Sequence, residues 1–379
     1  MDNIAGKKSG LSWAVQISTV LLVVLWVLPT FGLFVSSFRT GDQISTSGWW
    51  KALTTQETQL SPIRISGTEA ERDGQFVIEG NLFANAGTTL SAWGTSSREP
   101  TANEPGATAD LGDGLGLTVQ ADGSFLLTSS ASTADMRLPR VFATASTPPE
   151  FTVRNYGNVL FNPLAGQSVG QAFLNTMTVA IPATIIPILV AAFAAYALAW
   201  MEFPGRALLV AAVVGLLVVP LQLALIPLLQ FHNAIGIGKG YLGIWLAHTG
   251  FGLPLAIYLL RNYMVGLPRD IIENARVDGA TEFQIFVKII LPLSCPALAS
   301  FAIFQFLWTW NDLLVALVFL GTSNEQQVLT ANLVNLLGSR GGDWEILATS
   351  AFVSIFVPLV VFFSMQRFLV RGLLAGSVK

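Results

Sequence analysis

The sequence predicts an all-α polytopic membrane protein with six transmembrane helices and one β-rich insertion outside the membrane. Hydrophobic residues make up 52% of the 379 residues, charged residues make up only 11%, and the mean hydropathy is +0.60. Soluble chains carry about 25% charged residues, so this chain has too few charges to cover a water-facing surface. In addition, six segments are mostly apolar over about 20 residues, the length that crosses a hydrocarbon core of about 30 Å.

The composition and charge exclude several other classes of protein. A disordered chain needs low hydrophobicity and a high net charge, which is the opposite balance. A net charge of −3 disfavours nucleic-acid binding, which relies on a basic surface. A single cysteine permits no internal disulfide bond and therefore leaves the redox compartment open.

The six apolar segments include one at the N-terminus that resembles a signal peptide, because Lys7 and Lys8 precede it. Its apolar run is too long for a signal sequence, and Phe38-Arg39 makes a poor cleavage site, so we expect a retained helix. The expected spans are Trp13–Ser36, Phe173–Trp200, Ala207–Phe231, Tyr241–Leu260, Ala297–Leu320 and Ile346–Phe368.

The basic residues of the short loops predict the orientation, since loops rich in Lys and Arg stay in the cytoplasm. With the N-terminus inside, ten basic residues lie on the inner side, against two, Lys239 and Arg340, in the short outer loops. Both termini are therefore expected in the cytoplasm. The inner residues are Lys7, Lys8, Arg206, Arg261, Arg269, Arg276, Lys288, Arg367, Arg371 and Lys379.

Three regions of the chain differ in composition. Residues 1–36 form the cytoplasmic N-terminus and first helix, residues 37–168 form the insertion, and residues 169–379 form a five-helix core. This core includes a cytoplasmic loop, 262–296, and a C-terminal tail, 367–379. The insertion carries 21 of the 43 charged residues, so the low overall charge averages a charge-poor core and a charged insertion.

The insertion has the pattern of a small β-sandwich or barrel. Apolar residues alternate along Gln75–Phe83, and Gly116–Ser129 is typical of a hairpin with Ala121-Asp122-Gly123 at its turn. The stretch Thr95–Gly114 is poor in apolar residues, so we expect a loop there. Two interpretations remain: an insertion that decorates the helical core, which we favour, and an independent binding module.

Prolines within the expected spans point to a transporter. Proline removes a backbone donor and kinks a helix, and such breaks are tolerated in lipid only where protein or a water-filled cavity satisfies the freed carbonyls. The alternative is ordinary irregularity of membrane helices, in which proline is common. The residues are Pro29, Pro182, Pro187, Pro220, Pro227, Pro254 and Pro358.

The cytoplasmic loop 262–296 carries the most specific local signals. Asp270 can cap a helix, and Glu273 follows three residues later, as in a capping box. We expect a short helix at Ile271–Asp278 that ends at Gly279, where a left-handed backbone is easily adopted.

A second helix is predicted directly after this glycine. Thr281 and Gln284 repeat the capping-box spacing. Leu291-Pro292 is expected to end or kink the helix before the membrane. The 3.6-residue period places four apolar residues near one face: Phe283, Phe286, Val287 and Ile290.

The two helices therefore meet at a tight bend. We expect the first helix to expose the small residues Ala275, Gly279 and Ala280, which permit close approach of a partner, as in helix-in-groove docking. The alternative is a surface loop that only connects two spans. A loop that only connects two spans does not need two capping signals and a helix-ending proline within so few residues.

One motif in this loop resembles the EAA loop of ABC-importer permeases. It consists of Glu273-Asn274-Ala275-Arg276-Val277-Asp278-Gly279-Ala280, then Phe283, Phe286, Ile289, Leu291-Pro292 and Pro296. Asn274 departs from the family, which usually has alanine there, so we expect altered packing rather than lost docking. The resemblance implies a coupling helix that sits in a cleft of a separate ATPase subunit. The residues it implies are Glu273, Ala275, Asp278, Gly279, Ala280, Phe283, Leu291 and Pro292.

The resemblance covers roughly residues 10–36 and 150–379 and points to the carbohydrate-uptake branch, with MalG-like subunits. It implies the ABC type I importer permease fold. The large insertion is untypical of MalG-like chains and resembles the α-glucoside permease subgroup. The further matching segments are Pro148-Pro149-Glu150-Phe151-Thr152 with Asn155-Tyr156, Asn175-Thr176, Trp310-Asn311-Asp312 and the tail Arg367–Lys379.

The same resemblance implies further contact residues. In maltose-type permeases the tail reaches between the two ATPase subunits, which here points to Arg371, Gly372, Gly376 and Lys379. The outer loop Thr322–Glu345 resembles the segment that enters the binding protein, with Gly338, Gly341 and Gly342 at its tip. Asn311 and Asp312 either line the path or brace the helix, since an intramembrane charge is a functional candidate by default; we favour bracing.

Other motifs predict no enzyme on this chain. No phosphate-binding G-x-x-x-x-G-K-[ST] loop is present, so ATP and Mg belong on partner ATPase subunits and this chain needs no cofactor. Gly238–Gly243 fits G-x-G-x-x-G without the required strand, and Gly166–Gly170 fits G-x-S-x-G without a strand-turn-helix context. The sequence predicts no metal site, because His232 and His248 belong to no Cys/His cluster.

These observations predict the transmembrane permease subunit of an ATP-driven sugar importer in the bacterial inner membrane, with the insertion in the periplasm. Its substrates are expected to be α-glucosides or related oligosaccharides. Its expected partners are a homologous second permease, two ATP-binding subunits and a periplasmic sugar-binding protein. One alternative is a secondary transporter or channel that works without ATP, which needs intramembrane ion-coupling charges or inverted repeats. Another is a sensor or binding module, which deletion of residues 45–145 tests.

Overall fold

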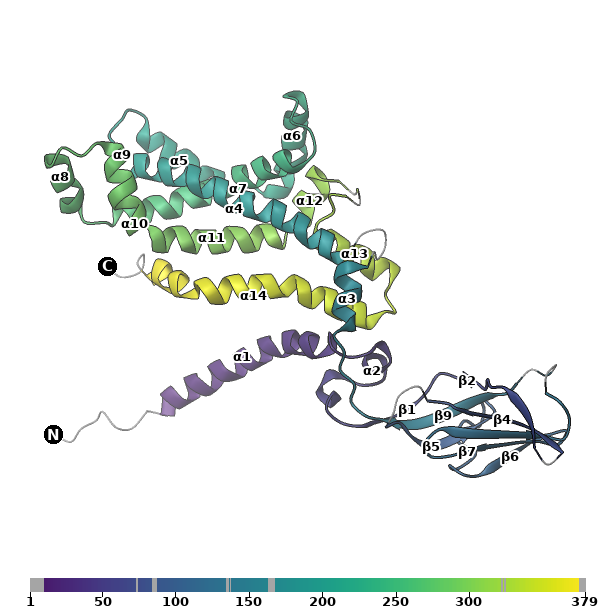
Figure 1. Ribbon diagram of the computed structural model, residues 1–379. Coiled ribbons are helices and arrows are strands. Elements are labelled where there is room, and N and C mark those ends of the chain that lie inside the picture. The colour runs from purple at the N-terminus through teal and green to yellow at the C-terminus, as the bar shows by residue number, and fades with distance from the viewer. Residues whose placement is uncertain are drawn as a thin grey trace, which may run out of the picture. The chain divides into compact units, whose positions relative to one another are not determined.

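The structure is a computed structural model in which the chain forms two compact units, Met1–Val153 and Arg154–Lys379 (Figure 1). It describes residues 10–374 except 73, 84–86, 134–135, 137, 163–167, 322 and 324, with side chains up to residue 368. The two units are described separately below.

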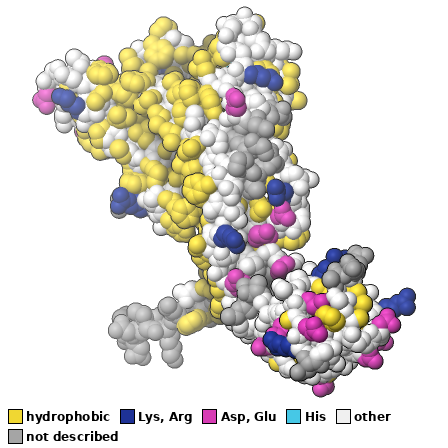
Figure 2. Space-filling view, turned by 45° about the vertical axis from the view of Figure 1, so that its right-hand side comes forward, with side chains coloured by type: hydrophobic (Ala, Val, Ile, Leu, Met, Phe, Trp, Pro, Cys, Tyr) yellow, Lys and Arg dark blue, Asp and Glu magenta, His cyan; other side chains and the backbone are white. Residues whose placement is uncertain are grey.

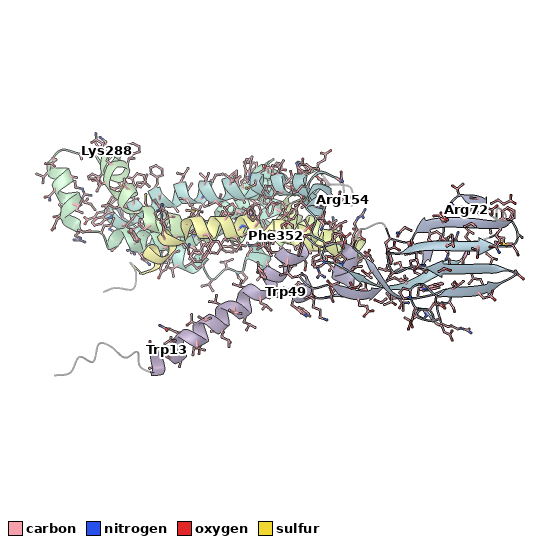
Figure 3. All side chains as sticks on the ribbon, turned by 60° about the horizontal axis from the view of Figure 1, so that its bottom comes forward. Trp13, Trp49, Arg72, Arg154, Lys288 and Phe352 are labelled. Carbon is pink, nitrogen blue, oxygen red and sulfur yellow. The ribbon has the colours of Figure 1, made fainter. Side chains whose placement is uncertain are left out.

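The first unit begins with one long helix, α1 (Gly10–Ser36), close to the expected first span. A helix, α2 (Gly41–Thr46), and a 3-10 turn, η2 (Trp49–Lys51), follow it. The ring of Trp49 packs edge-on against Phe31 of α1, with centroids 5.7 Å apart. A Cβ on Gly32 would lie 2.6 Å from Trp49 Nε1, so only glycine permits this approach. Figure 3 shows Trp49 beside the end of α1.

Two antiparallel sheets form the rest of the first unit. In one sheet β9 pairs with β1, β2 and β5, and in the other the strand order is β3-β4-β8-β7-β6. The strands are β1 (Gln56–Gln59), β2 (Ile63–Arg64), β3 (Glu69–Arg72), β4 (Gln75–Asn81), β5 (Thr89–Gly94), β6 (Thr108–Gly112), β7 (Leu115–Val119), β8 (Ser124–Ser129) and β9 (Arg140–Thr147).

Residues from both sheets share one apolar core, which makes the unit a β-sandwich. Trp93 of β5, Leu117 of β7 and Val141 of β9 are all fully buried in it. Burial alternates along the strands, because successive side chains of a strand point to opposite faces. The expected β-rich insertion is therefore confirmed, and the sandwich is the observed form.

The expected hairpin is confirmed: β7 pairs with β8 across a turn at residues 120–123. Gly123 adopts φ +82°, and the Asp122 carboxylate accepts hydrogen bonds from Ser124 N and Oγ at 2.9 and 2.6 Å. The expected loop Thr95–Gly114 is wrong at its end, where β6 pairs with β7. Strand β6 has only five residues, and the inward-facing ones are only half-buried, so its apolar alternation is weak in the sequence. The strand forms because it pairs with β7.

A carboxylate of β3 ties the sandwich together and gives it a pH dependence. Glu69 accepts hydrogen bonds from Ser132 Oγ at 2.8 Å, Thr133 N at 2.6 Å and the Thr133 hydroxyl. The Thr133 hydroxyl, followed by Ser132 and Thr133 N, lowers the pKa of this carboxyl below its ordinary 4.5. Because the folded pKa is lowered, the stabilisation is present above the unfolded pKa and is lost as pH falls through the folded pKa.

We therefore expect Glu69→Gln to lower the melting temperature of the first unit at pH 7 and to lower it less near pH 3, below the ordinary pKa of the carboxyl group. The measurement is thermal unfolding of the full chain in detergent at both pH values, followed by hydrogen exchange at the amides of the β-sandwich. Glu57→Gln on exposed β1 is the matched control. An equal difference between Glu69→Gln and the parent at both pH values would contradict this prediction.

The second unit is helical. The helices are α3 (Arg154–Phe161), α4 (Val169–Trp200), α5 (Arg206–Leu216), α6 (Leu221–Ala234), α7 (Tyr241–Val265), α8 (Arg269–Val277), α9 (Glu282–Ile285), the π-helical turn η3 (Phe286–Ile290), α10 (Leu291–Leu293), α11 (Cys295–Trp310), α12 (Leu314–Phe319), α13 (Leu329–Ser339) and α14 (Trp344–Leu374).

Among the described residues of the whole chain, four helices are long and apolar enough to cross a membrane: α1, α4, α7 and the greater part of α14. Two bent pairs raise this to as many as six if each pair is one span. Helices α5 and α6 bend by 110°, and the segments Glu282–Leu293 and Cys295–Trp310 bend by 70°. The helical membrane architecture is thus confirmed.

The expected span Ala297–Leu320 differs from the structure. Helix α11 ends at Trp310 and α12 begins at Leu314, so Asn311 and Asp312 lie in a break between them. Helix α12 begins two residues after Asp312, whose Oδ2 accepts from Ala316 N at 3.2 Å. Such a side chain competes with the helical backbone for its donors, which hydropathy alone does not reveal.

The helical unit is held together by close packing of small side chains. Ala191 and Ala195 of α4 and Ala256 of α7 are fully buried in one apolar cluster. A Cβ on Gly252 of α7 would lie 2.7 Å from Gln305 Oε1 of α11, so glycine sets how closely these helices approach. Figure 2 shows hydrophobic side chains gathered over the helical unit and Asp and Glu gathered on the β-sandwich.

Candidate functional site

The loop 262–296 forms one end of the helical unit, where α8, α9 and α10 lie together (Figure 1). Its first helix, α8, begins earlier than expected, because Pro268 is the N-cap and no side chain caps it. The expected capping box of Asp270 and Glu273 is therefore wrong. Proline is already close to the backbone conformation of a helix start, so the helix begins at Arg269, and Asp270 lies in the first turn, where its charge favours the helix dipole.

The end of α8 matches the expectation for Gly279. This glycine has φ +80°, Gly279 N donates to Arg276 O at 3.0 Å, and Ala280 N donates to Ala275 O at 3.0 Å. These two bonds form a Schellman motif, which satisfies the last carbonyls of the helix and requires a left-handed residue at the glycine position. The backbone bend is therefore determined locally.

The capping box of the second helix is confirmed. Thr281 Oγ1 accepts from Gln284 N at 3.3 Å, and Gln284 Oε1 accepts from Thr281 N at 2.9 Å. The helix continues through the π turn η3 to α10 and then breaks at Ser294. Pro292 lacks a backbone donor, which is consistent with the kink expected at Leu291-Pro292.

The two faces of α8 differ from the expectation for its small residues. Ile272 is buried, and Ala275 and Ala280 pack half-buried against the same apolar cluster. Of the three small residues, only Gly279 is exposed. Asn274 is exposed on the far side, so its departure from alanine does not disturb packing within this unit.

The expected apolar face of the second helix is only half right. Phe286 and Ile290 are buried, but the Phe283 side chain is 65% exposed and Val287 is 39% exposed. Ile285 is buried in place of Phe283. The π turn changes the residues per turn after Ile285, so a constant 3.6-residue period assigns the wrong residues to the core.

Five exposed residues around the glycine form what we call the bend surface: Glu273, Val277, Asp278, Gly279 and Phe283. Val277 is 87% exposed, which together with Phe283 places two large apolar side chains in solvent beside two carboxylates. Exposed apolar side chains rimmed by polar groups mark interaction sites. Leu291 and Pro292 lie outside this surface, at the start of α10, and Leu291 is half-buried.

A polar cluster missed by the sequence analysis joins the loop to helix α4. Glu282 Oε1 accepts from Arg276 Nε at 2.9 Å, and Glu282 Oε2 accepts from Arg276 Nη2 at 3.3 Å and from the Tyr196 hydroxyl at 2.5 Å. The hydrogen bond from Arg276 to this carboxylate raises the pKa of the guanidinium. The Phe286 ring packs on Tyr196 and Phe193, with centroids 5.2 and 4.6 Å away. Glu282 therefore links α8, α9 and α4.

Only part of this cluster had a signal in the sequence. Arg276 and Glu282 are opposite charges on either side of a predicted bend, so their ion pair was accessible to sequence reasoning. Tyr196 lies 86 residues before Glu282, and nothing local indicates that they meet. In Figure 3, the labelled Lys288 marks the position of η3 in this end of the unit.

The C-terminal end of α14 lies at the same end of the helical unit as α8 and α10 (Figure 1). Ser300 Oγ of α11 donates to Phe368 O at 3.1 Å, which joins the two helices there. Arg371 and Gly372 belong to α14, and their side chains are outside the description. Gly376 and Lys379 lie outside the described residues.

The expected outer loop lies at the opposite end and is largely helical. Helix α13 occupies residues 329–339 and includes Gly338, while Gly341 and Gly342 lie exposed in the turn before α14. Thr322 lies outside the described residues. Asn175 Nδ2 of α4 donates to Glu325 O at 2.9 Å and to Gln327 O at 3.0 Å, so the matching Asn175-Thr176 pair anchors this segment.

Asn311 and Asp312 line a cleft of about 720 Å³ together with Phe304 and Trp308. Asp312 also lies 3.9 Å from His248 Nε2, and the Thr330 hydroxyl donates to Asp312 O at 2.9 Å. The side chain of Asp312 thus contacts α12 while facing a cleft with aromatic walls. This geometry is compatible with both roles expected of Asp312, which are to line the path and to brace the helix.

A metal centre has no candidate in the part of the chain that the structure describes. Within those residues, no three His, Cys, Asp or Glu side chains stand close enough together to hold an ion.

Comparisons with known proteins agree with this architecture. Residues 173–374, more than half of the chain, match the family described as binding-protein-dependent transport system inner membrane component. The alpha-glucoside transport system permease protein AglG of Rhizobium meliloti is 63% identical over 98% of this chain and 98% of its own. That alignment necessarily includes the β-sandwich.

A second relative matches only part of the chain. The osmoprotective compounds uptake permease protein GgtD of Synechocystis is 59% identical over 230 residues, 61% of this chain and 76% of its own. This aligned length is close to that of the helical unit Arg154–Lys379. A chain of a bacterial ABC transporter involved in the import of the acidic polysaccharide alginate superposes with a TM-score of 0.47 at 21% identity, covering 59% of this chain and 81% of its own.

Proposed function

Because this chain belongs to the family of binding-protein-dependent transport system inner membrane components, we propose that it is the permease subunit of an ATP-driven importer of α-glucosides or related oligosaccharides. Sugar import by an ABC permease is the function that its relatives support. The narrower substrate class rests on the relative that shares the whole chain, β-sandwich included.

The bend surface is the single observation that carries the proposed coupling. It presents Val277 and Phe283 to solvent on a backbone bend that the Schellman motif determines. We assign it to a cleft in a partner ATPase subunit. ATP binding closes the ATPase dimer, α8 moves with its cleft, and the transport path opens outward to accept sugar by alternating access.

The Glu282 cluster supports the next step. A movement of α8 reaches α4 through Arg276, Glu282 and Tyr196, and the packing of Phe286 on α4 accompanies it. Charge-assisted hydrogen bonds are stronger than neutral ones, so this contact transmits force well. Helix α4 packs along α7, which places it to alter the path.

The proposed complex contains a second homologous permease, two ATP-binding subunits and a periplasmic sugar-binding protein. ATP and Mg belong to the ATP-binding subunits, and this chain contributes no catalytic group. Its tail residues Arg371, Gly372, Gly376 and Lys379 are proposed to contact those subunits. The proposed contacts to the binding protein are Gly338, Gly341 and Gly342.

The chain is an inner membrane component, and we propose that both termini are cytoplasmic and the β-sandwich is periplasmic. Six spans result if each bent helix pair crosses the membrane once. The location of α8 and the end of α14 at one end of the unit, with α13 at the other, supports this orientation (Figure 1). We assign Asp312 a bracing role, because it accepts a hydrogen bond from α12.

The deciding experiment is sugar uptake into proteoliposomes that contain the complete complex. We expect α-glucoside uptake to require internal ATP and the external binding protein and to continue when ion gradients are collapsed. Vesicles without this chain are the control. Uptake that follows an ion gradient and ignores ATP would contradict the proposal and favour a secondary transporter.

A further inference from the structure

A polar cleft of about 800 Å³ lies within the first unit. It is bordered by α2, by the residues from the end of β1 to the start of β2, and by the end of β9. Its volume is within the range of about 300–1,000 Å³ that small-molecule sites occupy. No function has been given to this cleft above. Its lining residues come from parts of the chain about 100 residues apart, such as Asp42 and Glu150.

The lining offers hydrogen-bonding groups without positive charge. Asp42 and Glu150 provide carboxylates, Gln59 provides an amide, and Thr58 and Ser61 provide hydroxyls. None of the described lining residues is Lys or Arg. The Asp42 carboxylate and the Gln59 amide make no hydrogen bond to the described residues, so both are available to a ligand. A ligand rich in hydroxyl groups can donate to the carboxylates and accept from the amide and hydroxyls.

One wall of the cleft is apolar and includes an aromatic ring. Phe83 lines it beside Leu82. The backbone of Phe83 is held by a hydrogen bond from Phe83 N to Asn81 Oδ1 at 2.7 Å, and its ring packs on Gly123, where an added Cβ would lie 2.3 Å from the ring. An aromatic ring next to hydrogen-bonding groups suits a ligand with one apolar and one hydroxylated face, as in a pyranose.

The opposite wall, α2, is held by hydrogen bonds from Arg39, which precedes it, and by a bond to the segment that follows β9. Arg39 is buried, and its Nη2 donates to Gln43 O at 2.8 Å and its Nη1 to Ser47 O at 3.0 Å. In the amide orientation that satisfies both of its polar atoms, Gln43 bonds Glu150 O and Glu150 N at 3.0 and 2.9 Å. The walls are therefore formed before any ligand arrives, which lowers the entropy lost on binding.

We propose that this cleft binds neutral oligosaccharides outside the membrane, through Asp42, Gln59 and the Phe83 wall. The choice of ligand class rests on the proposed function. The two carboxylates disfavour anions, and the hydroxyls and the aromatic wall favour an uncharged sugar over a simple cation. The site gives the β-sandwich unit a role of its own in sugar binding.

The test is isothermal titration of the full chain alone in lipid nanodiscs with maltose, trehalose and sucrose. We expect one of these disaccharides to bind the parent chain and the double variant Asp42→Asn/Gln59→Ala to bind it at least about tenfold more weakly, or about 1.4 kcal/mol. The matched control is Glu71→Gln/Gln75→Ala, which removes an exposed carboxylate and amide from β3 and β4, outside the cleft. Hydrogen exchange at the amides of the β-sandwich checks that each variant is folded.

Three results would overturn the proposal: no neutral disaccharide binds the parent chain, the cleft variant binds as tightly as the parent, or glucose 6-phosphate or spermidine binds in preference to the sugars. Because the titration uses no ATPase or binding protein, it is independent of transport. If the complete complex showed no ATP-driven uptake while the chain alone still bound sugar, the proposed function would be wrong and the cleft assignment would stand.

Discussion

Replacing Gly279 with valine is expected to reduce ATP-driven sugar uptake at least about tenfold. Gly279 has φ +80°, a conformation that costs a residue with a side chain about 1–2 kcal/mol and a β-branched residue more. No atom lies within 4 Å of a Cβ built there, so the strain comes from the backbone alone. Relief of that strain breaks the Schellman bonds and turns α8 away from α9, which displaces the bend surface.

The measurement is uptake together with ATPase activity in the reconstituted complex. Gly279→Asn is the matched control, because asparagine adopts left-handed backbone more readily than other residues with a side chain. It is expected to retain most of the uptake. If Gly279→Val transported sugar like the parent chain, the coupling role of this bend would be wrong. If both variants failed equally, the requirement would be for space in the partner cleft rather than for the backbone conformation.

Replacing Glu282 with glutamine is expected to uncouple ATP hydrolysis from transport. The change removes the charge that joins Arg276 of α8 to Tyr196 of α4. Hydrogen bonds to charged groups contribute about 1.5–3 kcal/mol. The Glu282 side chain is 43% exposed, so the lower end of that range applies. We expect uptake to fall about tenfold while ATPase activity is largely retained.

A double-mutant cycle separates this linkage from a general loss of stability. Tyr196→Phe is expected to lower uptake less than Glu282→Gln, and the double variant to be no worse than Glu282→Gln alone, because both changes remove the same contact. Tyr258→Phe and Glu202→Gln are matched controls on exposed positions with no partner among the described residues. Fully additive losses would contradict the linkage between α9 and α4.

Much of the local structure follows from the sequence. The apolar segments predicted the long helices, and the turn at Asp122-Gly123 predicted the β7–β8 hairpin. The Thr281–Gln284 spacing predicted a capping box, and Gly279 predicted a left-handed helix end. Each of these features depends on residues within a few positions of one another, so a short pattern contains the physical information that determines it.

Other local expectations failed where a competing local feature changed the outcome. Pro268 starts α8 in place of the Asp270 capping box, because proline already has a backbone conformation close to that of a helix start and a side-chain cap contributes only about 1 kcal/mol. The π turn after Ile285 leaves Phe283 and Val287 exposed and Ile285 buried, which a constant helical period does not anticipate.

The sequence by itself determined that this is a membrane permease with a β-rich insertion, and it predicted a loop that resembles the EAA loop. Only the tertiary structure decided how that loop engages the rest of the chain. Glu282 bonds Tyr196, 86 residues earlier in the chain, and Asp42 and Glu150 line one cleft although the strands of the β-sandwich separate them in the sequence. Such contacts arise because packing brings distant side chains together, and their energies depend on distance in space, which no pattern of neighbouring residues specifies.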